Sequence, residues 1–459
     1  MEHITQIING QDAFFKTHKT KDVQFRLKLL KKLRSELILR EDEIHNALYA
    51  DFKKPAFESL ISETGMVLME LNKAIRNLKK WAKPTAVFPA LLNFPSFSKI
   101  HKDPFGRILI IGPWNYPYQL ALAPIIGAVS AGNSVVFKPS ELATNTAAIV
   151  QSIISNVFNE GHVSVIEGGV ETSQFLLKQR WDLIFFTGSV TVGKIVAKAA
   201  AEFLTPVILE LGGKNPCIID ETTDLKLAAK RLVWGKFLNA GQTCIAPDYF
   251  LVHKSIKNDF ITEFSNAITA AYGEDIQQSE NYPRIINERN FDRLHKMLVD
   301  VNIVYGGQTD RTDVFIAPTL IDSPPMDSEV MKDEIFGPIS PVFSYETEED
   351  IATFMTHYEK PLSLYIFSNR KKFIASILEK YSFGGGCIND TLIHFVNDRL
   401  PFGGVGHSGM GAYHGKLTFD TFSHHKSITK RYSWPDLPIR YAPYQGKFKL
   451  LKSMLKMIG

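Results

Sequence analysis

The sequence predicts an α/β fold with more than one domain, and three observations support this. The chain has 459 residues, whereas a single domain usually contains roughly 100–200 residues. After residue 107, short apolar runs recur roughly every 20–30 residues, and segments with helical periodicity lie between them. Continuous apolar strands that alternate with helices are typical of a buried parallel sheet with right-handed crossovers.

The N-terminal region is expected to be helical and to end in an extended excursion. Between residues 24 and 80, Phe25, Leu29 and Leu33 begin a series of apolar residues at helical intervals among charged ones. The stretch 84–104 contains four prolines, so it cannot be the interior of a helix. We interpret it as an extended excursion between two parts of one domain.

Two series of strands and helices follow this excursion. The first predicts strands at 108–111, 135–137, 163–166, 183–186 and 207–209, and helices at 120–131, 143–158 and 192–203. The second predicts strands at 217–219, 249–252, 303–305, 363–367 and 386–388, and helices at 225–238 and 260–271. The break near residues 210–215 is the expected domain boundary. Ligands of such sheets bind at the carboxyl ends of the strands.

The final segment, residues 430–459, is basic. It contains seven basic residues and one acidic residue, with prolines at positions 435, 438 and 443. We expect an extended strand or arm here, followed by a short basic amphipathic helix. A weak peripheral contact with a membrane is one interpretation of this tail, and a solvated dimer arm is the one that we favour.

Composition argues against several classes of protein. The chain is 45% hydrophobic and 22% charged, as in ordinary globular proteins, and a net charge of +4 is too small to indicate nucleic-acid binding. The widely spaced Cys217, Cys244 and Cys387 form no disulfide framework, which fits the cytoplasm. The adjacent His424 and His425 have no accompanying ligands, so we assign no metal site. We expect neither a signal peptide nor a transmembrane helix.

Cys244 is the strongest candidate nucleophile. It lies in a small, polar turn at 239–247 that contains Gly241, whereas Cys217 and Cys387 lie in strand-like apolar runs that suit inert packing. By itself, a lone cysteine is more often a buried bystander than a nucleophile. A nucleophile of this kind also needs a base, an oxyanion donor and an electron acceptor.

Glu210 and Asn115 can supply the first two of these partners. Glu210 ends the apolar strand 207–209, where partial desolvation would raise its pKa toward the range of a general base. Asn115 follows the strand 108–111, and its side-chain amide can donate a hydrogen bond to an oxyanion. Each residue also has a simpler interpretation: Glu210 as a solvated strand-end carboxylate, and Asn115 as a residue that shapes the turn.

Several short patterns can bind a nucleotide. The segment 188–193 lies between a strand and a helix, where backbone N–H groups can bind an anion. The segment 404–409 matches G-x-G-x-x-G, but it follows a loop instead of a strand, so we interpret it as a turn. Lys138 and Glu141 follow a strand and suit a ribose or a phosphate, or else form a plain surface turn.

The order of these motifs along the chain resembles the aldehyde dehydrogenase superfamily over nearly the whole sequence. The motifs are PWNYP (113–117), KPSE (138–141), FTGS (186–189), LELGGK (209–214), GQTC (241–244), EIFGP (334–338) and PFGG (401–404). Further segments resemble its class 3 branch, which contains fatty and coniferyl aldehyde dehydrogenases: 215–217, 246–249, 413–416 and 419–424.

The resemblance implies a role for each matching catalytic residue. Cys244 matches the family nucleophile, and its thiolate would attack the aldehyde. Asn115, with the backbone N–H of Cys244, matches the oxyanion hole that stabilises the alkoxide. Collapse of the alkoxide would transfer hydride to the nicotinamide and leave a thioester on Cys244. Glu210 matches the base that activates the water for hydrolysis of this thioester.

The resemblance implies NAD as the cofactor, with NADP as an alternative. Lys138 and Glu141 match residues that hold the adenine ribose, and Glu141 should repel a 2′-phosphate. Glu334 and Phe336 match residues at the nicotinamide ribose and ring. The other cofactor-binding residues that it implies are Trp114, Gly188, Ser189, Gly193, Leu211 and Gly212.

The resemblance also implies a division of the chain and a substrate class. Residues 1–81 and 107–209 would form a Rossmann-type NAD(P)-binding domain, 210–415 an α/β catalytic domain, 82–106 with 416–440 a small β bridging element, and 441–459 a basic C-terminal tail. Because the family's bridging elements join protomers, we predict a homodimer. An apolar funnel that suits a medium-chain aliphatic or aromatic aldehyde is predicted from Trp234, Tyr116, Ile393 and Phe395.

Three other functions compete with this interpretation. A CoA-acylating aldehyde dehydrogenase would use a thiol in place of water, but such enzymes tend to lack the base, and Glu210 is present. An esterase-like hydrolase would use the Cys244–Glu210 pair without redox chemistry, which leaves the cofactor motifs unexplained. A structural protein on the same fold would be expected to have a damaged site.

Overall fold

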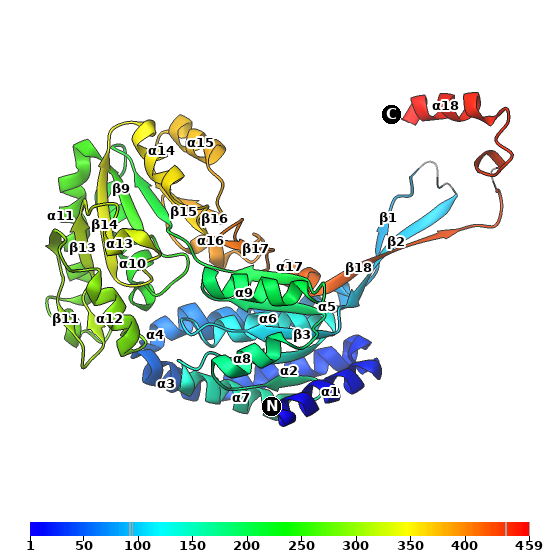
Figure 1. Cartoon of the computed structure of the whole chain (residues 1–459), viewed down its shortest axis with the longest axis horizontal. Helices are drawn as coiled ribbons and strands as arrows, with labels where there is room; N and C mark the ends of the chain where they lie inside the picture. The colour runs from blue at the N-terminus through cyan, green and yellow to red at the C-terminus, as the bar shows by residue number, and fades with distance from the viewer. Residues whose placement is uncertain (91–92, 94, 437, 459) are drawn as a thin grey trace.

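The structure, a computed structural model, describes residues 1–90, 93, 95–436 and 438–458. These residues form two α/β lobes, each built around its own large sheet, and a narrow arm that projects from one lobe (Figure 1). The C-terminal helix lies at the far end of the arm. The predicted α/β class is therefore confirmed. No helix in the described part of the chain is long and apolar enough to cross a membrane.

The N-terminal helices pack against the first lobe, as the helical periodicity predicts. They are α1 (Glu2–Lys16), α2 (Val23–Leu39), α3 (Glu41–Phe52), α4 (Ala56–Ser59), the π-helical turn η2 (Leu60–Thr64) and α5 (Gly65–Trp81). Asp22 caps α2, because its side chain accepts a hydrogen bond from the backbone of Gln24. Leu30 and Leu33 of α2 are fully buried, so the apolar stripe of the sequence faces the core.

The first sheet has the strand order β17-β7-β6-β3-β4-β5. Its parallel strands are β3 (Arg107–Ile111), β4 (Ser134–Lys138), β5 (Val163–Val165), β6 (Leu183–Thr187) and β7 (Val207–Glu210). Its crossover helices are α6 (Gln119–Ala131), α7 (Thr144–Val157), α8 (Val170–Leu177) and α9 (Val190–Ala201). The strand order reverses between β3 and β6, so a ligand crevice is expected where these two strands end.

The second sheet has the strand order β10-β13-β14-β9-β8-β15-β16. Its strands are β8 (Pro216–Ile219), β9 (Tyr249–His253), β10 (Ile303–Tyr305), β13 (Thr319–Asp322), β14 (Ile339–Tyr345), β15 (Ser363–Phe367) and β16 (Gly385–Ile388), with a separate hairpin of β11 (Thr309–Asp310) and β12 (Phe315–Ile316). The helices are α10 (Leu225–Phe237), α11 (Lys257–Tyr272), α12 (Glu288–Lys296), α13 (Glu329–Lys332), α14 (Glu348–His357), α15 (Lys371–Lys380) and α16 (Ile393–Val396).

Two central strands of this sheet, β13 and β14, are absent from the sequence prediction. β14 contains Pro341, which pairs with Ile321 of β13 inside the sheet. Proline is disfavoured in a central strand because it cannot donate a hydrogen bond, so the sequence pattern argues against a strand here. Burial of this segment in the core overrides that local preference.

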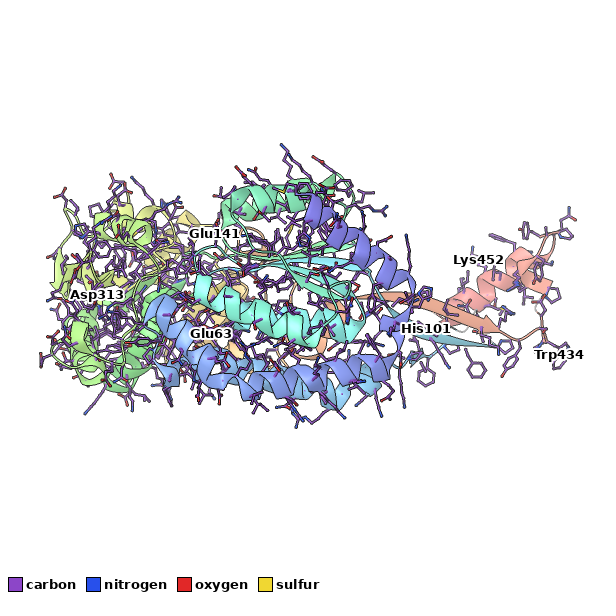
Figure 2. The ribbon with its side chains drawn as sticks, turned by 90° about the horizontal axis from the view of Figure 1, so that it is seen from below. Glu63, His101, Glu141, Asp313, Trp434 and Lys452 are labelled. Carbon is purple, nitrogen blue, oxygen red and sulfur yellow. The ribbon has the colours of Figure 1, made fainter. Side chains whose placement is uncertain are left out.

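The arm is a three-stranded antiparallel sheet of β1 (Thr85–Val87), β2 (Ser96–Pro104) and β18 (Ser423–Arg431). β18 pairs with β2 along its whole length, so the proline-rich excursion is extended as predicted. Beyond it lie η7 (Pro438–Arg440) and α18 (Lys447–Ile458), which match the predicted arm and amphipathic helix. Figure 2 shows Trp434 and Lys452 on this arm, outside the body that contains Glu63.

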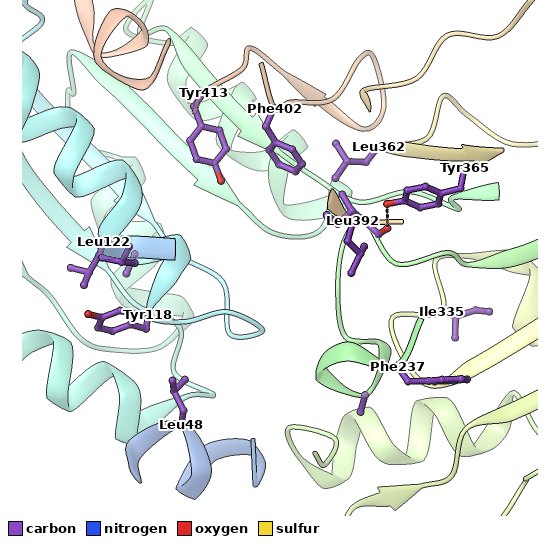
Figure 3. Packing of buried hydrophobic residues seen from close by; sticks show 14 of the residues in the cluster. Leu48, Tyr118, Leu122, Phe237, Ile335, Leu362, Tyr365, Leu392, Phe402 and Tyr413 are labelled. Carbon is purple, nitrogen blue, oxygen red and sulfur yellow. Dashed lines mark hydrogen bonds between the residues drawn. The ribbon is translucent and has the colours of Figure 1, made fainter. Parts of the chain in front are cut away.

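The two lobes share one apolar core, which holds the ends of both sheets together. Tyr118 and Leu122 of the first lobe belong to the same buried cluster as Phe237 and Ile335 of the second (Figure 3). The chain also returns to the first lobe near its end: β17 (Gly409–Met410) pairs with β7, and α17 (Lys416–Thr421) precedes the arm. The strand ends of the two sheets are therefore fixed relative to each other by this shared core.

Candidate active site

Cys244 lies in a turn between α10 and β9 that begins with left-handed backbone. Asn239, Ala240 and Gly241 have φ angles of 56°, 52° and 74°. This conformation costs about 1–3 kcal/mol for each residue other than glycine, so surrounding contacts must hold it. At Gly241 a side chain is excluded, because a Cβ there would lie 2.4 Å from the carbonyl oxygen of Gly337.

Asn115 lies directly against this turn, as the sequence predicts. Its Nδ2 donates a hydrogen bond to the carbonyl oxygen of Gln242 at 3.1 Å. Asn239 Nδ2 donates to the carbonyl oxygens of Asn115 at 2.8 Å and Gln242 at 3.2 Å. The neighbouring Tyr116 hydroxyl is 2.6 Å from Thr243 Oγ1. The amide of Asn115 and the residues before Cys244 are thus connected by a short, buried network.

Glu210 is a buried carboxylate that makes no hydrogen bond to the described part of the chain. It ends β7, paired with Thr187 of β6 and Gly409 of β17, and its side chain is 3% exposed. Neither carboxyl oxygen has a partner among the residues that the structure describes. Burial alone holds the pKa of Glu210 well above its usual range. The solvated alternative is wrong, because the carboxylate is buried, and a desolvated carboxylate of this kind is suited to proton transfer.

The thiol of Cys244 lies near two carboxylates. Burial raises its pKa, and the charges of Glu334 and Glu210 raise it further, while the backbone N–H groups of Cys244 and Ile245 act in the opposite direction. Without a ligand, the protein therefore favours the protonated thiol. A nearby base is needed to form the thiolate that reacts as the nucleophile.

Glu334 and Gly212 meet closely on the cofactor side of the predicted site. A Cβ at Gly212 would lie 2.0 Å from Glu334 Oε2, so only glycine allows this approach. Glu334 Oε1 is buried and has no partner within the described ranges. Burial raises the pKa of Glu334 to about 8, and the charge of Asp248 contributes. Phe336 packs edge-on against Trp114, with ring centroids 5.3 Å apart.

The other predicted cofactor residues lie where the strands of the first sheet end. Lys138 Nζ is 2.8 Å from Glu141 Oε2. Ser189 caps α9, since its Oγ accepts a hydrogen bond from the N–H of Val192. Two neighbouring positions must be small: a Cβ at Gly188 would lie 2.6 Å from the Phe186 ring, and one at Gly193 would lie 2.7 Å from Leu211.

A groove of about 1010 Å³ runs between these strand ends and α12 of the second lobe. Trp114 and Ser189 line one side, and Arg289, Arg293 and Lys296 lie on the other. The sequence alone did not identify these basic residues, because they belong to no motif. Cationic side chains and the N-terminus of α9 suit a phosphorylated ligand, and the carboxylates of Glu288, Asp292 and Glu329 also line this groove.

The glycine pattern at 404–409 forms a turn, as predicted. A Cβ at Gly404 would lie 2.1 Å from the carbonyl oxygen of Ser408, which in turn accepts a hydrogen bond from the N–H of Leu211. The segment therefore packs against the end of β7 and has a structural role in this arrangement.

Several buried polar residues at the site were not identified from the sequence. Glu58 accepts a hydrogen bond from the N–H of Asn239, and Glu63 forms a fully buried ion pair with Lys54 at 2.5 Å. The Tyr413 hydroxyl is buried without a partner in the described structure; burial, then the charges of Glu210 and Cys244, raise its pKa. Glu58 and Glu63 lie in a region that reads as ordinary helix, so no local pattern marks them, whereas Tyr413 lies in the segment 413–416 that resembles the class 3 branch but was given no role.

Comparison with known proteins gives a consistent result. The model of the aldehyde dehydrogenase family matches residues 1–428. The 4,4'-diaponeurosporen-aldehyde dehydrogenase of Staphylococcus aureus is 46% identical, covering 99% of this chain and 100% of that protein. The dimeric NADP-preferring aldehyde dehydrogenase of Canis lupus familiaris is 41% identical, covering 97% and 99%. Other relatives include members of aldehyde dehydrogenase family 3.

A solved structure described as the substrate-bound state of Staphylococcus aureus AldH superimposes with a TM-score of 0.97 at 46% identity. The superposition covers 98% of this chain and 99% of that one. The overall fold is thus shared with an experimentally determined structure.

Proposed function

The chain belongs to the aldehyde dehydrogenase family, and we propose that it oxidises its substrate through a thioester on Cys244. The predicted family, its class 3-like branch, the oxidation of aldehydes to acids and the use of NAD or NADP are confirmed by these relatives. The roles of individual residues are our proposal. The observation that carries it is the buried Glu210, which has no partner among the described residues and whose charge acts on the Cys244 thiol, together with the Asn115 amide bound to the turn of Cys244.

In the first half of the reaction, Cys244 adds to the aldehyde carbon. Its thiol proton moves to Glu210 through a water molecule, because the raised pKa of Glu210 makes it a suitable acceptor. The side-chain amide of Asn115 and the backbone N–H of Cys244 donate hydrogen bonds to the alkoxide. Such donors are effective because they are already oriented before the charge develops.

In the second half of the reaction, Glu210 first releases the proton taken from the Cys244 thiol through water to the solvent, and its ionised carboxylate then activates a second water molecule. The carboxylate removes a proton as the water oxygen attacks the thioester carbonyl carbon, and the carbon–sulfur bond then breaks. The products are the carboxylic acid and the thiolate of Cys244. This role explains why Glu210 is buried without a partner: a hydrogen bond to a protein group would compete with the water.

The cofactor site fits NAD on the evidence of its own residues. The buried, unpartnered Glu334 Oε1 can accept a hydrogen bond from a ribose hydroxyl, and Phe336 can pack beside the nicotinamide. Lys138 and Glu141 would hold the adenine ribose, and the Glu141 carboxylate disfavours the 2′-phosphate of NADP. A bound nicotinamide would supply the acceptor for the hydride that the substrate carbon loses.

The substrate that we propose is an aldehyde with an apolar tail, medium-chain aliphatic or aromatic. Trp234, Ile393 and Leu400 are large apolar residues left exposed, and Phe395 packs against Phe402 nearby in the chain. Thr391 donates a hydrogen bond to the carbonyl of Arg231, which brings the loop before Ile393 next to the helix of Trp234. A longer polyene aldehyde is the second candidate, because the Staphylococcus relative named for one matches over the full chain.

We also propose a homodimer joined through the arm. β18 is an edge strand of the arm and most of its side chains are exposed, and an open edge of this kind is normally covered. The relative from Canis lupus familiaris is named as dimeric.

We propose the same domain division as the sequence predicts. Its catalytic segment, 210–415, includes β17, although this strand pairs with β7 in the first sheet. The three free cysteines are compatible with the cytoplasm.

The test of the chemical proposal is a pair of variants. Cys244→Ala should abolish NADH formation while cofactor affinity, measured by fluorescence titration, stays within about twofold. Glu210→Gln should slow both halves of the reaction, and deacylation more than acylation, so that a covalent acyl-enzyme accumulates that intact-protein mass spectrometry detects. Full NADH production by Cys244→Ala, or normal turnover of the acyl-enzyme in Glu210→Gln, would contradict the assignments.

A series of aldehydes of increasing chain length, each assayed with NAD and with NADP, tests the substrate and cofactor proposals. An optimum at medium-chain or aromatic aldehydes with NAD is expected. Light scattering tests the dimer: a monomer mass at working concentration would refute it.

A further inference from the structure

One short segment of the N-terminal region contacts both loops of the active site. Glu58 of α4 and Glu63 of η2 are buried, with exposed fractions of 8% and 0%. Glu58 Oε1 accepts a hydrogen bond from the N–H of Asn239 at 2.7 Å. Glu63 Oε2 accepts hydrogen bonds from the N–H groups of Tyr118 and Gln119 at 3.0 and 3.1 Å. Glu58 therefore contacts the turn of Cys244, and Glu63 contacts the loop that follows Asn115.

The contact of Glu58 falls on the first residue of the left-handed run. Asn239 is where the backbone leaves α10 and enters the strained conformation that continues to Gly241. Such a conformation persists only when surrounding contacts hold it. A hydrogen bond to an ionised acceptor is roughly twice as strong as one between neutral groups, so a carboxylate is well suited to this task.

From Asn239 the connection continues to the oxyanion donor. The Asn239 side chain donates to the carbonyl oxygens of Asn115 and Gln242, and the Asn115 amide donates to that same Gln242 carbonyl. Gln242 stands two residues before Cys244 in the chain. A shift of Asn239 would therefore displace the Asn115 amide and the nucleophile turn together.

We propose that Glu58 is a positioning residue, whose carboxylate holds the turn through Asn239 N–H and thereby aligns the Asn115 amide with Cys244. This inference rests on the roles proposed above for Asn115 and Cys244. Glu58 acts through the backbone of Asn239, not by contact with the substrate. Its loss should affect kcat more than the KM for the aldehyde, because alignment matters most in the transition state.

The groups around Glu58 should make the alignment of the Asn115 amide with Cys244 depend on pH. Burial raises the pKa of Glu58 to about 7, and Glu63 adds to this, while Lys54 and the Asn239 N–H act in the opposite direction. Below this pH Glu58 takes up a proton and becomes a weaker acceptor, so kcat should fall as pH falls through about 7. The other titratable groups that face it are tyrosines whose pKa burial raises, so they stay neutral: Tyr116, Tyr272 and Tyr282.

The test compares Glu58→Ala, Glu58→Gln and a matched control, Glu43→Gln. Glu43 is a glutamate on the exposed surface, paired with Arg40. For each variant, kcat and KM are measured from pH 5.5 to 8.5, and the rate of Cys244 alkylation by iodoacetamide is measured without aldehyde. Glu58→Ala should lower kcat about tenfold, as expected for loss of one charge-assisted hydrogen bond, and should change the alkylation rate.

Glu58→Gln should restore most of kcat above pH 8, because its amide oxygen still accepts the Asn239 N–H. Its kcat should depend less steeply on pH near 7 than that of the wild type, and Glu43→Gln should match the wild type throughout. A wild-type kcat in Glu58→Ala, or an unchanged pH profile in Glu58→Gln, would overturn the proposal and assign the acidic limb to Glu210. If Glu58→Ala does not fold, the profile of Glu58→Gln decides alone. Failure of the proposed function would appear separately, as activity in Cys244→Ala.

Discussion

Glu63, in η2, and Glu210, at the end of β7, are both buried glutamates, but they differ in their hydrogen bonds. Glu63 is 0% exposed, and it accepts hydrogen bonds from Lys54 Nζ and from two backbone N–H groups. Glu210 is 3% exposed, and neither of its oxygens has a partner in the structure as described. The Glu63 carboxylate thus has hydrogen-bond donors within the protein, whereas the Glu210 carboxylate has none among the described residues.

We infer from this difference that Glu63 has a structural role and Glu210 a chemical one. A buried carboxylate with every hydrogen bond made stabilises the loops that it contacts. A buried carboxylate without partners costs stability, and that cost is found mostly at functional sites. The comparison predicts that changes at Glu210 affect the reaction, whereas changes around Glu63 affect the fold.

The largest expected effect is on turnover in Glu210→Gln. Loss of a general base should lower the steady-state rate about 10²–10⁴-fold. The unfolding free energy should not decrease, because no hydrogen bond is lost and the amide carries no charge to be buried. Aldehyde oxidation and urea unfolding measured on the same preparation provide the check. A variant that loses stability and keeps turnover would reverse the roles assigned to the two glutamates.

The next effect is on stability in Lys54→Met. Removing the lysine leaves Glu63 as an uncompensated buried charge, and breaking such a pair costs about 3–5 kcal/mol of unfolding free energy. Lys416→Met is the control, because Lys416 pairs with Asp420 at the surface, where such pairs contribute about 0–1 kcal/mol. Urea unfolding measures both. Equal, small losses in the two variants would show that the buried pair has no special structural role.

Glu334 lies between these two cases: its Oε1 is buried without a partner among the described residues, but the backbone of Gly213 donates a hydrogen bond to its carboxylate. Gly212→Ala would place a Cβ 2.0 Å from Glu334 Oε2 and force that carboxylate to move. Overpacking of this kind costs about 1–3 kcal/mol, so the KM for NAD should rise roughly 5–150-fold. Gly10→Ala is the control, because a Cβ there meets nothing within 4 Å. An unchanged KM for NAD would remove Glu334 from the cofactor site.

The smallest expected effect is the pH dependence of stability that Glu210 contributes. Because its folded-state pKa is raised, the folded protein binds a proton more tightly than the unfolded chain does. The contribution of Glu210 to the unfolding free energy therefore falls as pH rises from about 4.5 through the folded-state pKa. Glu210→Gln lacks this contribution, so it should gain stability relative to wild type between pH 5.5 and 8. A constant difference across that range would contradict the raised pKa.

The sequence predicted much of the site because its motifs stand at strand ends. Asn115, Lys138 and Glu210 each follow an apolar run, and parallel strands bring such positions to one edge of the sheet. Glu58, Glu63 and Lys54 were missed because their partners are 9 to 181 residues away, and helical periodicity does not indicate which polar side chain is buried. Pro341 shows the same limit within the fold, since its strand is stabilised by burial against local preference.

By itself, the sequence determined the α/β class, the helical N-terminus, the extended arm and the residue types available for chemistry, because these depend on local periodicity and ordered motifs. Only the tertiary structure decided which buried carboxylates accept hydrogen bonds from the protein and which do not. That outcome depends on desolvation and on donors from other segments: Glu63 accepts a hydrogen bond from Lys54 Nζ, whereas no described residue donates one to Glu210. Burial acts on a side chain only after the whole chain has packed around it.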